Sequence, residues 1–149
     1  MATLQKNYVI YLVSYMRIIA TSSHHAIYVD IDEGKSGELL HVTGSIQQGM
    51  NFEARTSSHP FKGTTCEWIK PAGRVQQDKL AQLEAACRMI PPPAKQFHLS
   101  KPLVPKDKIR HCQHWVAEAI EFLREKGVLE PLGEDESGDI TQRWWGGRS

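Results

Sequence analysis

The chain has 149 residues, of which 40% are hydrophobic and 23% are charged, and its formal net charge is +1. These values are ordinary for a globular protein and predict a single domain that buries its own core. Because so small a net charge gives no overall field that would gather nucleic acid or an anionic membrane, we expect no nucleic-acid partner.

The first half of the chain has the composition of antiparallel strands, rich in Tyr, Val and Ile. The apolar run within residues 8–19 is too short to span a bilayer, so we interpret it as a buried strand and expect no integral membrane segment. A turn with two glycines at 32–37 predicts a hairpin that brings residues near 24–28 opposite residues near 39–43. The predicted strands are 7–19, 23–31, 38–43, 50–56 and 64–70.

From Gln76 onward the apolar residues recur at helical spacing. A first helix is predicted up to Ile90, with Leu80, Leu83, Cys87 and Ile90 on one face, and the prolines at 91–93 end it. After a loop at 94–108, a second helix is predicted over about 110–126. Its apolar stripe consists of Cys112, Val116, Ala119, Ile120 and Leu123.

These elements predict the α+β class, with a small antiparallel sheet of about five strands packed against two main helices. The domain is expected to cover residues 1–131. The segment 132–149 is polar and glycine-rich, and we predict a mobile tail there unless Trp144 and Trp145 dock on the domain.

Cys112 is the candidate nucleophile, because it lies near the predicted start of the second helix. A free thiol has a pKa of about 8.5, and a helix N-terminus or a neighbouring histidine favours the reactive thiolate. Asp107 is a possible N-cap that would place Cys112 one turn inside the helix, and a small buried core residue is the equally open alternative. Cys66 and Cys87 are interpreted as structural, in a predicted strand and on a core stripe.

Histidines on the predicted hairpin are the candidate base and its orienting partner. His24 and His25 point to opposite faces of their strand, so only one of them can face a given helix. His41 lies on the neighbouring strand and could meet His24 side by side. A single histidine in a strand is more often a structural residue. The joint arrangement of one cysteine and two histidines instead favours a site of Cys112, His24 and His41.

A metal site is the competing interpretation near the second helix, where His111 and His114 flank Cys112. Residues one and two positions apart diverge around a helix, and no carboxylate or further cysteine is spaced to complete a tetrahedron. The three cysteines are an odd number at wide spacings without a C-x-x-C motif, which favours a reducing, cytoplasmic setting over a disulfide framework. We expect no metal and no cofactor.

Three short runs resemble a known family. They are His24-His25-Ala26-Ile27-Tyr28-Val29, Leu40-His41-Val42 and His111-Cys112-Gln113-His114-Trp115-Val116. They resemble the H-W-A-I-Y-V, I-H-L and N-C-E-H-F-V signatures of lecithin:retinol acyltransferase-like proteins, which are permuted relatives of NlpC-type, papain-like cysteine enzymes. The histidine strand, the stretch Ile90 to Pro93 and the run Cys112-Gln113-His114-Trp115 also resemble small uncharacterised fungal proteins.

The resemblance implies a sheet packed on helices and a Cys-His-His catalytic triad. By this alignment His24 matches the base, His41 the orienting residue and Cys112 the nucleophile. His25 stands where the family has tryptophan, and His111 stands where it has asparagine.

Two function hypotheses follow. In the first, the protein is a thiol hydrolase or acyltransferase, in which Cys112 attacks an amide, ester or thioester of a small-molecule or peptide acyl substrate. A biosynthetic pathway is one setting for this reaction. In the second, the fold serves as a non-catalytic binding or interaction module, with the cysteine and histidines packed and the tryptophans supplying contact surface. Thiol reactivity separates them.

Overall fold

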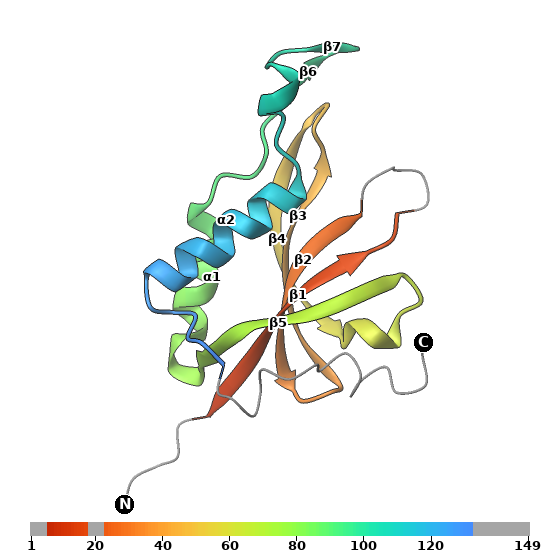
Figure 1. Cartoon of the computed structure of the whole chain (residues 1–149). Coiled ribbons are helices and arrows are strands. Elements are labelled where there is room, and N and C mark those ends of the chain that lie inside the picture. The colour runs from red at the N-terminus through yellow and green to blue at the C-terminus, as the bar shows by residue number, and fades with distance from the viewer. Residues whose placement is uncertain (1–5, 18–22, 133–149) are drawn as a thin grey trace, which may run out of the picture.

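The computed structural model describes residues 6–17 and 23–132. Within these residues the chain forms a five-stranded antiparallel sheet and two α-helices, so the predicted α+β class is confirmed (Figure 1). The strands of the sheet are β1 (Asn7–Tyr15), β2 (His24–Asp32), β3 (Ser36–Ser45), β4 (Gly49–Ser58) and β5 (Cys66–Gln76). The helices are α1 (Leu80–Met89) and α2 (Cys112–Glu125), with short 3-10 turns at η1 (Pro60–Lys62), η2 (Gln77–Lys79) and η3 (Lys106–Lys108).

The strand order is β4-β3-β2-β1-β5. β2 and β3 form the predicted hairpin, in which Ile27 lies opposite Leu40. In its turn, both carboxylate oxygens of Asp30 accept a hydrogen bond from the Gly34 N–H at 3.2 Å. Gly34 has a φ of 76°, a left-handed conformation that glycine adopts without steric cost. The hairpin places β3 beside the start of β2, where the two adjacent histidines lie.

Several predicted boundaries are wrong. β1 ends at Tyr15, and residues 18 and 19 of the predicted first strand lie outside the described residues. β5 continues to Gln76, because its pairing with β1 runs past Pro71 through a register shift. The first helix therefore begins at Leu80 rather than near Gln76.

The predicted loop at 94–108 contains structure of its own. Two short strands, β6 (Phe97–His98) and β7 (Lys101–Pro102), pair as a small separate hairpin, and η3 follows them. The prolines at 102 and 105 predicted a plain loop. The short strands were missed because strands of two residues leave no periodic signal in the sequence.

Both helices lie on one face of the sheet (Figure 1). The predicted apolar stripe of α2 is buried, and Trp115 is fully buried with it. Against the helices pack the sheet residues Tyr8, Ile10, Ile27, Val29, Leu40, Val42, Met50 and Val75. The opposite face has a second, smaller core of Tyr11, Val13, Ala26, Tyr28, Leu39 and Ile69. Strand side chains alternate, so neighbours along β2 belong to different cores.

No helix among residues 6–17 and 23–132 is long and apolar enough to cross a bilayer. The predicted tail beyond residue 132, with Trp144 and Trp145, lies outside the described residues.

Candidate active site

Cys112 is the first residue of α2 and is 3% exposed. The N-cap is His111, whose backbone N–H donates to Nδ1 of His114 at 2.9 Å. Asp107 lies in η3 and is not the cap of this helix. The thiol is therefore at the helix N-terminus, where unpaired N–H groups and the helix dipole favour an anion.

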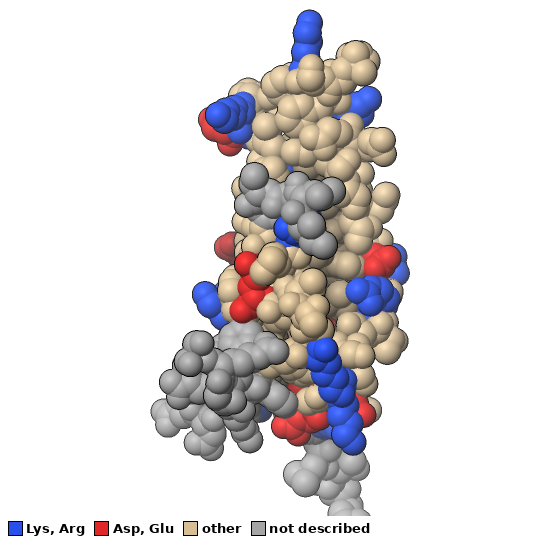
Figure 2. All heavy atoms as spheres, turned by 90° about the vertical axis from the view of Figure 1, so that its right-hand side faces the viewer, with Lys and Arg blue, Asp and Glu red and all other residues tan. Residues whose placement is uncertain are grey.

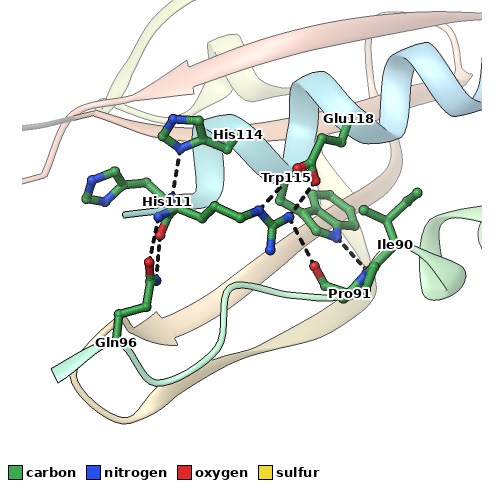
Figure 3. Close-up of polar contacts among 8 residues, drawn as sticks. Ile90, Pro91, Gln96, His111, His114, Trp115 and Glu118 are labelled. Carbon is green, nitrogen blue, oxygen red and sulfur yellow. Dashed lines mark hydrogen bonds and ion pairs between the residues drawn. The ribbon is translucent and has the colours of Figure 1, made fainter. Parts of the chain in front are cut away.

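The buried amide of Gln96 holds the segment that leads into α2 (Figure 3). Its Oε1 accepts from the Arg110 N–H at 2.6 Å, and its Nε2 donates to the Arg110 carbonyl at 2.9 Å. The Arg110 side chain forms an ion pair with Glu118 at 2.5 Å, and Trp115 Nε1 donates to the Ile90 carbonyl at 3.0 Å. These contacts fix the start of α2 from both sides, because they engage the backbone before it and two side chains of its first turns.

His24 and His41 are hydrogen-bonded to each other across the hairpin. His24 Nε2 lies 2.8 Å from His41 Nδ1, and His41 Nε2 lies 2.8 Å from Glu53 Oε1. Glu53 is directly opposite His41 in the β3–β4 pairing and also pairs with Arg55 at 3.2 Å. The buried His41 ring thus links His24 to a carboxylate.

Arg17 connects this histidine pair to the thiol. Its Nη2 lies 3.1 Å from His24 Nδ1 and 3.5 Å from Cys112 Sγ. A guanidinium only donates, so His24 Nδ1 must accept, and the proton of a neutral His24 ring is then on Nε2. That N–H donates to His41 Nδ1, and His41 Nε2–H in turn donates to Glu53. The hydrogen bonds run in one direction, from Arg17 to the carboxylate.

The pKa values agree with a neutral His24. Burial, followed by the neighbouring His41 ring and Arg17, lowers the pKa of His24 to about 4. The hydrogen bond from His41 lowers the pKa of Glu53 below its ordinary value. At neutral pH the cation beside the thiol is therefore Arg17 rather than an imidazolium.

The structure brings Cys112, His24 and His41 into one network but does not place the thiol against the imidazole. Within the described ranges the thiol hydrogen-bonds to Arg17, which lies between Cys112 and His24. The reason is that His24 points to the face of the sheet opposite the helix that carries Cys112. His24 alternates with Ala26 and Tyr28 on the face opposite the helices, whereas His25 shares the helix-covered face with Ile27.

Sequence reasoning missed Arg17 and Glu53. Glu53 had a usable signal, because the turn at 44–49 predicts a second hairpin that sets a residue of the next strand opposite His41. Arg17 had no such signal, because it lies two residues past the end of β1 and contacts Cys112, which is 95 positions away in the sequence.

His25 lines a groove of about 970 Å³ beside α2. Its ring packs edge-on against Trp68, with ring centroids 5.3 Å apart, and burial lowers its pKa. Gln113, which also lines the groove, donates from Nε2 to the Ser23 carbonyl at 3.0 Å. Apolar side chains along the groove are Leu12, Ala72, Val116, Ala117 and Ile120. Since His25 and Gln113 directly follow His24 and Cys112 in the chain, one end of the groove lies beside the candidate site.

The other two cysteines have different surroundings. Cys87 is fully buried, and burial raises the pKa of its thiol to about 12. Cys66 is half-buried at the start of β5. Among the described residues no group of three or more His, Cys, Asp or Glu side chains is arranged to hold a metal ion, His111 and His114 included.

No curated protein and no solved structure shows significant similarity to this chain. Residues 10–130 match a family of unknown function, DUF6540. The matched region includes all five residues of the network from Cys112 to Glu53 and both helices. Because the match covers most of its length, the chain belongs to the DUF6540 family.

Proposed function

We propose that this protein is a cysteine-dependent hydrolase or acyltransferase with a permuted papain-like fold, acting on an amide, ester or thioester through an acyl-enzyme. The observation that carries the proposal is the network Cys112–Arg17–His24–His41–Glu53, which ends at a thiol on a helix N-terminus. Packing alone does not require five polar side chains to be joined in this order. The resemblance to lecithin:retinol acyltransferase-like proteins supports the same roles for Cys112, His24 and His41.

In the proposed reaction, Cys112 Sγ attacks the substrate carbonyl and forms a carbon–sulfur bond. The oxyanion of the tetrahedral intermediate accepts from backbone N–H groups at the start of α2. The bond to the leaving group then breaks, and that group takes the proton that the thiol transferred to His24. Water or an amine attacks the S-acyl group and returns a proton through His24 to the sulfur, which regenerates the thiol.

Arg17 has a separate role in this scheme. A guanidinium has no free lone pair and cannot pass a proton from the thiol to His24. In the arrangement observed, it instead lies where it stabilises a thiolate, while His24 stays neutral and able to accept a proton. Direct transfer between Cys112 and His24 requires Arg17 to leave Nδ1, so Arg17 and His24 act at different stages.

The groove beside α2 is where we expect the acyl part of the substrate to lie. It begins at His25 and Gln113, next to the nucleophile, and continues along apolar residues of α2 such as Val116 and Ile120. The substrate carbonyl would then be at the groove end nearest Cys112.

The test is the pH dependence of iodoacetamide labelling at each cysteine, read by mass spectrometry. Buried Cys87 and half-buried Cys66 are internal controls in the same sample. We expect Cys112 to be labelled faster than both controls, because Arg17 and the N-terminus of α2 stabilise the reactive thiolate. Arg17→Gln should slow the labelling of Cys112, and His24→Ala should abolish turnover in a screen of amides, esters and thioesters.

Labelling of Cys112 that is as slow as that of Cys87 at every pH would overturn the proposal. The non-catalytic binding module would then be the better description. A reactive Cys112 whose labelling profile is the same in Arg17→Gln would keep the enzyme and remove Arg17 from its mechanism.

A further inference from the structure

Residues 95–108, here called the arm, project away from the body of the protein (Figure 1). The arm consists of the β6–β7 hairpin and η3, and it extends beyond the turn that joins β3 and β4. Its hairpin is a two-stranded sheet of its own and adds no strand to the main sheet. Neither core cluster of the protein includes a residue of the arm, so the arm is not explained by packing.

The tip of the arm is an exposed leucine in an unfavourable conformation. Leu99 is 86% exposed, and Leu103, beyond the second strand, is 57% exposed. Leu99 has a φ of 57°, and it is the one described non-glycine residue with positive φ. A leucine pays a steric cost there that glycine or asparagine largely avoids. The position thus combines backbone strain with apolar exposure, and neither stabilises the isolated fold.

The arm that carries this apolar tip is rich in basic side chains. The arm contains four lysines, all exposed, at positions 95, 101, 106 and 108, and a single acidic residue, Asp107. The whole chain has a formal net charge of only +1. Figure 2 shows Lys and Arg side chains above and on both flanks of the upper end of the molecule, with an Asp or Glu side chain beside those on the left. The small net charge of the whole chain therefore hides a local excess of positive charge on the arm.

The base of the arm is firmly attached. Gln96 holds both backbone groups of Arg110 (Figure 3), and its own backbone N–H donates to the Ile46 carbonyl at 2.8 Å. Leu103 N–H donates to the Gln96 carbonyl at 2.7 Å, which closes the hairpin. These bonds fix the leucine tip and its lysines relative to the start of α2.

We infer that the arm docks on an anionic bilayer surface, with Leu99 and Leu103 entering the interface and the lysines contacting lipid phosphates. Exposed apolar side chains on a lysine-rich arm match a bilayer, whose surface is anionic and whose interior is apolar. Nucleic acid would satisfy the lysines but offers little apolar surface for the leucines. An acidic protein surface is the remaining alternative. It would pair with the lysines, but unlike a bilayer it does not offer an apolar layer into which a projecting leucine can insert.

The inference is tested by co-sedimentation with vesicles of phosphatidylcholine alone and of phosphatidylcholine mixed with phosphatidylserine. We expect the native chain to bind the mixed vesicles and to lose binding as salt rises. Lys101→Gln with Lys106→Gln should weaken binding roughly 25-fold, because each surface lysine contributes about fivefold. The control, Lys62→Gln with Lys126→Gln, removes the same charge from exposed positions outside the arm and should bind like the native chain.

Leu99→Gly is the most informative single variant. It relieves the positive φ, so the protein should fold at least as well, yet it should bind mixed vesicles about tenfold more weakly. Unchanged binding by Leu99→Gly would overturn insertion of the leucine tip into the bilayer. Failure of the native chain to bind mixed vesicles at low salt would overturn the inference outright and favour an acidic protein partner. Cys112→Ser should bind vesicles normally, so this test is independent of the proposed catalysis.

Discussion

The two faces of the sheet are made by the same strands but have different tasks. The helix-covered face is apolar and closes against α1 and α2, while the opposite face combines a smaller core with the hydrogen-bonded pair His24 and His41. The proposed nucleophile belongs to the helix side and the proposed base to the other side, and Arg17 joins them. Alternation along a strand therefore separates structural from chemical side chains at adjacent positions.

Replacing the thiol should have the largest effect. Cys112→Ser preserves size but removes the nucleophile, and we expect turnover of any substrate found in the screen to fall by at least about 10⁴-fold. Cys66→Ser, on the opposite face, is the matched control and should keep nearly full turnover. Equal losses in the two variants, measured at saturating substrate, would contradict the assignment of Cys112.

A pair of adjacent leucines compares the two cores directly. Leu40 packs under the helices and Leu39 on the opposite face, and both are at most 2% exposed. Each leucine-to-alanine change should reduce the free energy of unfolding by about 2–5 kcal/mol in urea titrations. Leu99→Ala, at the exposed tip, should change it by less than about 0.5 kcal/mol. If Leu39→Ala behaved like Leu99→Ala, the second face would not be a true core.

The loss of folding stability at low pH should originate on the face of the sheet that the helices do not cover. Burial lowers the pKa of His24 and of His59 to about 4, so below the ordinary value of 6.5 the unfolded chain binds more protons than the folded one. Stability should be complete above about pH 6.5 and fall as the pH drops toward 4. Asp30, whose pKa burial raises to about 6, opposes this trend.

Thermal unfolding across that pH range tests the assignment. His59→Gln cannot take up the proton, so its stability should fall less between pH 6.5 and 4. The exposed His98→Gln is the control and should follow the native slope. Asp30→Asn should make the decline steeper, and an unchanged slope in both His59→Gln and Asp30→Asn would show that other groups govern acid unfolding.

The smallest effect is expected at Glu53, at the far end of the network. Glu53→Leu removes the acceptor for His41 Nε2–H and should lower turnover by about tenfold, whereas Glu53→Gln keeps an acceptor oxygen and should lower it less. Glu33→Gln, an exposed carboxylate in the turn between β2 and β3 and outside the groove, is the control. A larger loss for Glu53→Gln than for Glu53→Leu would mean that the charge is not acting through His41.

Much of this was predictable from local patterns. The Tyr-, Val- and Ile-rich composition of the first half predicted the strands, and the spacing of Val116, Ala119 and Leu123 predicted the buried face of α2. The glycine turn at 32–37 brought His41 near His24, and the two rings do form a hydrogen bond. These features depend on short stretches of chain, where periodicity and turn chemistry act directly.

The tertiary structure decided what no local pattern specifies. Alternation shows that His24 and His25 face opposite ways, but which face the helices cover depends on how the chain returns after β5, a long-range choice. The position of Arg17 between thiol and imidazole depends on the same packing. The sequence by itself determined which residues share a face. Only the folded chain determined which face meets Cys112, because the hydrogen bond that reaches the thiol joins residues 95 positions apart in the sequence.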